Sequence, residues 1–108
     1  MIIYTNYIIP KKMVAITLAT IILIRPQFKN DVGVVEHEKV HVKQFWRYWG
    51  LFPFLYLFSK TYRLKFEVEA FKKQLEFNPS AIGLYAKGLS ENYNLNVSRE
   101  TIESLLKG

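Results

Sequence analysis

The stretch from Val34 to about Tyr48 contains neither proline nor glycine, so nothing in its backbone interrupts regular structure. Its side chains recur at the three- and four-residue spacing that places them on one stripe of an α-helix. That stripe consists of Val34, His37, Val40, His41, Gln44 and Phe45. We therefore predict a helix over residues 34–48, followed by a reversal of the chain at Gly50 and Pro53.

The N-terminal third has the pattern of strands. Residues 14–19 alternate between larger apolar and smaller side chains, the period of two that puts one face of a strand on a core. Ile21 to Ile24 then form a continuous apolar run, which is typical of a strand covered on both faces. We expect two strands or one bent strand here, ended by Pro26.

Three further helices are predicted towards the C-terminus. The first runs from about Lys60 to Phe77, with Leu64, Glu67, Val68, Phe71 and Leu75 on one side. The others begin at Asn78-Pro79 and at Ser98. We predict an α+β fold, in which a small antiparallel sheet packs beside a helix pair and C-terminal helices complete the core. At 108 residues the chain should form a single domain, 1–108.

Composition limits the chemistry available to the chain. It has no cysteine, so any metal ion must be held by histidine and carboxylate, and there are only two histidines. The net charge of +6 is dispersed apart from the pairs Lys11-Lys12 and Lys72-Lys73. No basic arm or nucleic-acid motif stands out, so nucleic-acid binding is not expected.

Two apolar segments raise the question of whether the chain spans or contacts a membrane. Met13 to Ile24 is shorter than the roughly 20 residues of a spanning helix, and Arg25-Pro26 follows it in place of a cleavage site. We therefore expect a retained N-terminus and a cytoplasmic protein. Leu51 to Phe58 is also too short to span, and it belongs either to the core or to a surface that contacts a membrane.

The predicted first helix carries the motif His37-Glu38-x-x-His41. Two imidazoles one turn apart on one helical face can both reach a single zinc ion. Zinc lowers the pKa of a bound water to roughly 7, and a carboxylate beside the first ligand can take a proton from that water. We predict that His37 and His41 bind zinc and that Glu38 is the general base.

A catalytic zinc site usually has a third protein ligand. The extended motif with a third histidine is excluded, because Gln44 and Arg47 stand where it requires glycine and histidine. A glutamate of the following helix remains. Glu67 shares the predicted buried side, where an unpaired carboxylate would be costly, whereas Glu69 has lysines around it. We predict Glu67 as the ligand, with a salt bridge to Arg63 or Lys60 as the other explanation for its burial.

The motif His37-Glu38-x-x-His41, followed by Glu67-Val68-Glu69-Ala70 in the next predicted helix, resembles the gluzincin group of zinc metallopeptidases. More narrowly, it is similar to the small phage-type proteins of minimal zincin form. The resemblance covers about residues 14–77. It implies hydrolysis of peptide bonds, with Glu67 as a zinc ligand and an aspartate four residues later supporting a ligand histidine. That position is Phe71.

Another group must therefore hold the remaining N–H of a ligand histidine. The candidates are Gln44, Asp31 and a backbone carbonyl, although Gln44 fits equally well as an ordinary polar helix residue. The oxyanion of the tetrahedral intermediate is usually stabilised by a Tyr, His or Arg side chain. The residues open for this role are Tyr62, Arg63, Tyr85 and Tyr93.

The predicted function is zinc-dependent cleavage of a peptide or protein substrate, bound as an added strand at an exposed edge of the sheet. Two alternatives belong to other classes. One is a zinc-stabilised structural or interaction module that cleaves nothing. The other is a basic adaptor that binds nucleic acid or a membrane surface through Trp46, Trp49 and residues 51–58. The sequence predicts no oligomeric state.

Overall fold

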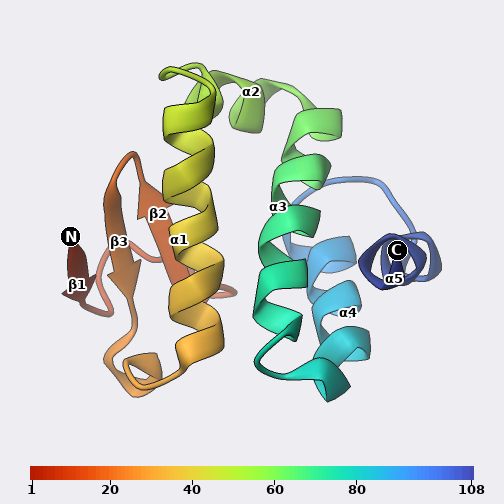
Figure 1. Cartoon of the computed structure of the whole chain (residues 1–108), viewed down its shortest axis with the longest axis horizontal. Helices are drawn as coiled ribbons and strands as arrows, with labels where there is room; N and C mark the ends of the chain where they lie inside the picture. The colour runs from red at the N-terminus through yellow and green to blue at the C-terminus, as the bar shows by residue number, and fades with distance from the viewer.

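The computed structural model describes all residues from 1 to 108 and has a small sheet and five α-helices (Figure 1). This arrangement confirms the predicted α+β class. The strands are β1 (Ile2–Tyr4), β2 (Ala15–Leu18) and β3 (Ile21–Ile24). The helices are α1 (Val32–Arg47), α2 (Phe52–Phe58), α3 (Lys60–Leu75), α4 (Ile82–Asn92) and α5 (Arg99–Lys107), with short 3-10 turns at Pro26–Phe28 and Pro79–Ala81.

The sheet has the order β1-β3-β2 and is mixed. β2 and β3 form the expected antiparallel pair, with Ala15 opposite Ile24 and Leu18 opposite Ile21. β1, which the sequence pattern did not reveal, adds in parallel to the other side of β3. Ile22, Leu23 and Ile24 of the central strand are buried, as predicted for a strand covered on both faces. β2 is left as an edge strand.

The smaller side chains of β2 face α1. Ala15 is buried against Val34 of α1, and the Thr17 hydroxyl oxygen lies 3.3 Å from the backbone carbonyl oxygen of Glu38. The larger Val14 and Leu18 are exposed. Small residues on the inner face allow the strand to approach the helix closely, which brings β2 beside the HExxH motif.

The helix boundaries follow local signals. The Asp31 carboxylate accepts a hydrogen bond from the backbone N–H of Val34 and caps α1, and Ser59 caps α3 in the same way. After α1, Trp49 and Gly50 both have positive φ angles, 51° and 80°, and the chain turns into α2. The segment from Gly50 to Ser59, predicted only as a reversal, thus contains a helix of its own.

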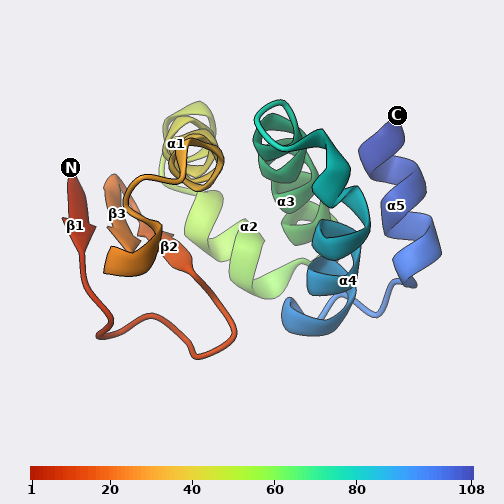
Figure 2. The ribbon, with the colours of Figure 1, turned by 90° about the horizontal axis from the view of Figure 1, so that it is seen from below.

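α1 and α3 run antiparallel and side by side, with α2 crossing between them at one end (Figures 1 and 2). The sheet covers one side of α1, while α4 and α5 lie beyond α3. Each outer layer has its own apolar cluster, one between sheet and α1 and one between α3, α4 and α5. The seam between α1 and α3 separates these clusters, and polar side chains fill it.

Candidate metal centre

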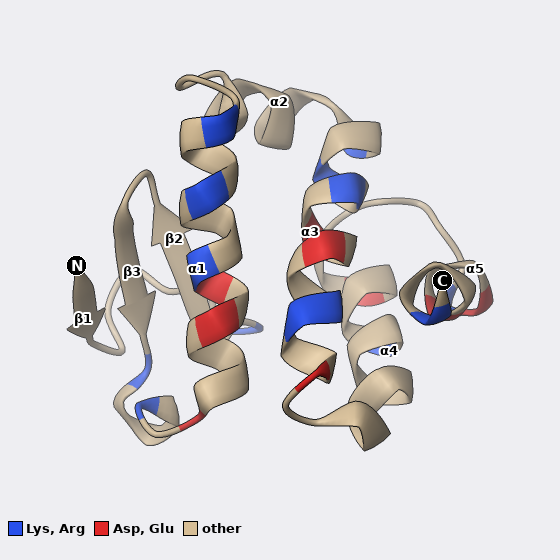
Figure 3. Ribbon diagram, viewed as in Figure 1, with Lys and Arg blue, Asp and Glu red and all other residues tan.

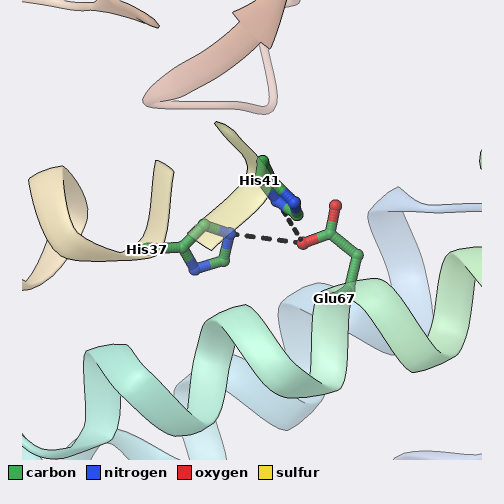
Figure 4. A group of neighbouring side chains, drawn as sticks. All are labelled: His37, His41 and Glu67. Carbon is green, nitrogen blue, oxygen red and sulfur yellow. Dashed lines mark ion pairs between the residues drawn. The ribbon is translucent and has the colours of Figure 1, made fainter. Parts of the chain in front are cut away.

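Three buried side chains meet in the seam between α1 and α3 (Figure 4). His37 and His41 project from successive turns of α1, and Glu67 projects towards them from α3. The Nε2 atoms of the two histidines lie 3.2 Å and 3.3 Å from the same Glu67 oxygen, Oε1. One ligand atom from each residue lies within 4.8 Å of the others. The structure therefore brings together the three residues that the sequence singled out as ligands.

The donor atoms of this group fit a divalent metal ion. Glu67 Oε1 is buried and receives no well-directed hydrogen bond, even though two nitrogen atoms face it. A buried carboxylate oxygen without such a partner is costly and calls for an explanation. Two imidazole nitrogens and one carboxylate oxygen form a donor set found in zinc sites that keep an open position.

Tyr56 of α2 completes the surroundings of Glu67. Its phenolic O–H donates a hydrogen bond to Glu67 Oε2. Burial and the charge of Glu67 both raise the pKa of Tyr56, so the phenol stays protonated and remains a donor. With Oε2 held by Tyr56, Oε1 is the oxygen that faces the histidines.

His41 is oriented by a chain of contacts that leads to the protein surface. Its Nδ1 lies 2.8 Å from Gln44 Oε1. The Gln44 amide donates to the Phe66 carbonyl at 3.0 Å and to Glu69 Oε1 at 2.8 Å. Both of these partners only accept, so Gln44 Oε1 must be the atom that accepts from His41 Nδ1–H. The His41 Nε2 atom is then directed at the metal centre.

Glu69 forms the outer part of this chain of contacts. The Arg47 guanidinium donates to both of its carboxylate oxygens, each over 3.1 Å. Glu69 therefore pairs with Arg47 and Gln44, whereas the sequence placed it among lysines. It lies outside the group of three that could hold a metal ion.

His37 is held by apolar packing. The ring of Phe71 meets it edge to face, with centroids 4.3 Å apart, and His37 Nδ1 has no hydrogen-bond partner. Asp31, which the sequence offered as a support for a ligand histidine, instead caps α1. Phe71 thus contacts the histidine from the position at which the resemblance calls for an aspartate.

Glu38 lies beside the three-residue group and is itself buried. The Thr17 hydroxyl of β2 donates to Glu38 Oε1 over 2.8 Å. The other carboxylate oxygen, Oε2, lies 3.6 Å from His37 Nε2. Glu38 is therefore fixed by the sheet and directed at the proposed ligands, and it is not a member of the ligand group.

The electrostatics of the group favour an ion pair in the metal-free protein. Burial alone would raise the pKa of Glu67, but the nearby charges of His41 and His37 lower it below its ordinary value. Burial alone would lower the pKa of His41, yet Glu67, Glu38 and Gln44 raise it to about 9. A metal ion that binds here must replace the proton on His41.

Two adjoining cavities open onto these residues. A cavity of about 230 Å³ is lined by the three proposed ligands, Glu38, β2 residues 15–17, Pro10, Met13, Phe52, Tyr56 and Tyr93. A cavity of about 360 Å³ borders it and shares His37, Glu38 and Tyr93. The three residues that could hold a metal ion are therefore buried, yet they line a cavity bordered by the edge strand β2.

The four residues considered for the oxyanion lie at different places. Tyr93 lines both cavities, whereas Tyr85 lines only the larger one. Tyr62 packs on the outer side of α3 against Tyr48 and lines neither. Arg63 donates to the Tyr93 carbonyl over 3.3 Å. Burial and the charges of Glu67 and Glu38 raise the pKa of Tyr93, so its hydroxyl stays protonated beside the centre.

Comparison of the chain with protein-family models, curated proteins and solved structures finds no match in any of the three.

Sequence reasoning missed two residues of the site, Thr17 and Tyr56. Thr17 occupies a small-residue position in an alternating strand, and Tyr56 lies in the apolar segment after α1. In α2 the spacing of Phe52 and Tyr56 is four residues, which would have placed them on one face had a helix been predicted there.

Proposed function

We propose that this protein is a zinc-dependent peptidase of the gluzincin type. The observation that carries the proposal is the convergence of His37, His41 and Glu67 in one buried seam, with Glu38 beside them and an open cavity in front. Structural zinc sites are usually closed by four protein ligands, whereas catalytic sites keep one position open. Three protein ligands and a base favour catalysis over a structural role.

In this proposal His37, His41 and Glu67 hold the zinc ion, which when bound supplies Lewis acidity and makes water acidic enough to ionise near neutral pH. Glu38 is the general base. Because Thr17 holds Oε1 of Glu38, Oε2 is the oxygen left to take the proton of the attacking water and pass it to the leaving amine. Thr17 is thus a positioning residue for the base.

Two protonated phenols face the same cavity and have separate roles. Tyr56 donates to Glu67 Oε2 and so fixes the orientation of the third ligand. Tyr93 has no such bond to Glu67 and lines both cavities. We assign to Tyr93 the donation of a hydrogen bond to the oxyanion that develops on the scissile carbonyl.

The edge strand β2 offers a place for an extended peptide. The Arg25 N–H donates to the Val14 carbonyl, so alternation along the antiparallel pair points the backbone groups of Val14 and Ile16 at β3. The N–H and C=O groups of Ala15 and Thr17 then point to the open edge, beside the metal centre. A substrate added there as an antiparallel strand would gain main-chain hydrogen bonds.

The larger cavity is suited to a side chain of that substrate. Apolar side chains such as Met13, Val34 and Phe71 line it together with polar ones such as Gln74 and Asn78. We therefore expect apolar or aromatic residues next to the cleaved bond.

The decisive experiment replaces Glu38 by glutamine, which keeps the size of the side chain and removes its basic oxygen. Zinc-loaded wild type is first screened for cleavage of unstructured proteins and mixed peptides. Glu38→Gln should retain zinc and fold but lose roughly 10²–10⁴-fold in rate. The matched control is Glu36→Gln on the same helix, because Glu36 is only half-buried and lies near Lys39.

Metal content and cleavage are scored separately. Equal cleavage by Glu38→Gln and wild type, with zinc bound in both, would contradict the assigned base. Stoichiometric zinc without cleavage of any substrate would favour the structural module. Failure of the wild type to bind zinc would contradict the proposed metal site itself.

A further inference from the structure

A second region of the molecule combines features that the metal centre does not explain. Six large apolar side chains stand in solvent where α1 ends, α2 crosses and α3 begins (Figure 1). We call them the apolar end. They are Trp46, Trp49, Leu51, Phe54, Leu57 and Phe58. Trp49 is 88% exposed and Phe58 82%, so these side chains contribute almost nothing to the core.

α2 has two faces with different surroundings. Phe52 and Tyr56 point to the metal-site cavity, while Phe54, Leu57 and Phe58 remain exposed. None of the six side chains of the apolar end lines either cavity at the metal centre. Clustered exposed apolar side chains on a folded protein mark a contact surface. The apolar end is therefore a candidate contact surface for a partner outside the chain.

Basic residues outnumber acidic ones around the apolar end. Between Val42 and Phe66 there is no aspartate or glutamate, whereas the same segment contains Lys43, Arg47, Lys60, Arg63 and Lys65. Figure 3 shows Lys and Arg on α1 and α3 near α2, with the acidic residues of both helices farther away. Arg47 is paired with Glu69, and the half-buried Arg63 donates to the Tyr93 carbonyl, which leaves Lys43, Lys60 and Lys65 without an ion pair. The partner should consequently be anionic.

We propose that the apolar end docks this protein on an anionic lipid surface. Tryptophan, phenylalanine and leucine side chains insert at the boundary between headgroups and acyl chains, while neighbouring lysine and arginine side chains attract anionic headgroups. No helix of the protein is long and apolar enough to cross a membrane, so the contact is confined to the interface. The inference is independent of peptidase activity.

The test uses vesicles and the intrinsic fluorescence of the protein. Both tryptophans of the chain, Trp46 and Trp49, belong to the apolar end, so their emission reports its surroundings directly. Vesicles of phosphatidylcholine with phosphatidylglycerol should shift the emission to the blue and cosediment with the protein. Vesicles of phosphatidylcholine alone should bind more weakly, and added salt should weaken binding to the mixed vesicles.

Matched variants locate the contact. Leu57→Ser should lower the partition coefficient about tenfold, whereas Leu84→Ser on α4 should leave it unchanged. The two leucines are similarly exposed, 63% and 69%, so neither variant should impair folding. Lys60→Glu should likewise lower the coefficient roughly tenfold, while Lys87→Glu, with the same change in net charge, should have little effect.

Three results would overturn the proposal. One is the absence of any fluorescence shift or cosedimentation with either vesicle. Another is an equal loss of binding in Leu57→Ser and Leu84→Ser. The third is a self-associated form in solution that Leu57→Ser dissociates while vesicles bind nothing, because the apolar end would then be a contact between copies of the chain.

Discussion

The seam between α1 and α3 buries His37, Glu38, His41 and Glu67, whereas the apolar end of the same helix pair exposes six large apolar side chains. Both regions reverse the usual placement of side chains. Burial of ionisable groups carries a desolvation cost, and exposure of Trp, Phe and Leu forgoes the free energy of burial.

The two regions differ in what would relieve these costs. The seam is enclosed and its donor atoms converge on a point, so a single small cation is the matching ligand. The apolar end lines neither cavity of the candidate metal site and lies near lysines that have no ion pair, so an extended anionic surface matches it. The shape and the polarity of an anomalous region together indicate the kind of ligand.

Of the changes considered, removal of metal should alter the stability of the protein most. With free zinc about a thousandfold above its Kd, the free energy of unfolding should rise by about 4 kcal/mol relative to protein in a strong chelator. Thermal denaturation with and without the chelator measures the difference. Superimposable melting curves would mean that the seam is an ordinary buried ion pair.

Substitutions of the two glutamates of α3 should separate the ligand from its surroundings. Glu67→Gln should weaken zinc binding by more than about a hundredfold, beyond the loss typical of a supporting residue. Glu69→Gln should cost less than about tenfold, because glutamine can still accept from Gln44. Competition with a chromophoric chelator gives both affinities. A larger loss in Glu69→Gln would contradict the ligand assignment.

The decline of stability with rising pH should disappear when zinc is bound. In metal-free protein His41 has its pKa raised from 6.5 to about 9, so its contribution is complete below pH 6.5 and is lost as pH rises through 9. That loss should be on the order of 1–3 kcal/mol. Glu67, whose pKa is lowered, contributes above its ordinary value of 4.5 and loses this contribution only in more acidic solution.

Zinc-loaded protein should instead keep a nearly constant free energy of unfolding between pH 6.5 and 9, because zinc has replaced the His41 proton and the unfolded histidine is also neutral in this range. Urea unfolding at several pH values, with and without chelator, tests both trends. The same slope in the two series would show that zinc does not displace the His41 proton.

The smallest change is expected at the apolar end. Leu57→Ser should alter the free energy of unfolding by no more than about 0.5 kcal/mol, because the side chain is already in solvent. Leu89→Ala, at a fully buried position of the α4–α5 core, should cost about 2–5 kcal/mol by comparison. Urea titration of both variants measures this contrast. A large loss in Leu57→Ser would mean that the end is part of the core.

Much of the architecture could be predicted from the sequence because it depends on neighbours along the chain. The four-residue separation of His37 and His41 sets their common face once a helix forms, and helical periodicity likewise placed Glu67 on the buried side of α3. The capping residue Ser98 located the start of α5. The identity of the metal and the hydrolytic function stay predictions.

The contacts around the ligands were decided only by the tertiary structure. Thr17 contacts Glu38, which lies 21 residues away in the sequence, and Gln44 contacts Glu69, which lies 25 residues away. Tyr56 contacts Glu67 from helix α2, which the sequence pattern did not predict. The parallel addition of β1 to β3 has the same origin. Backbone periodicity fixes which side chains share a face, but only the packing of separate elements determines which faces meet, since that depends on the fit of all side chains between them.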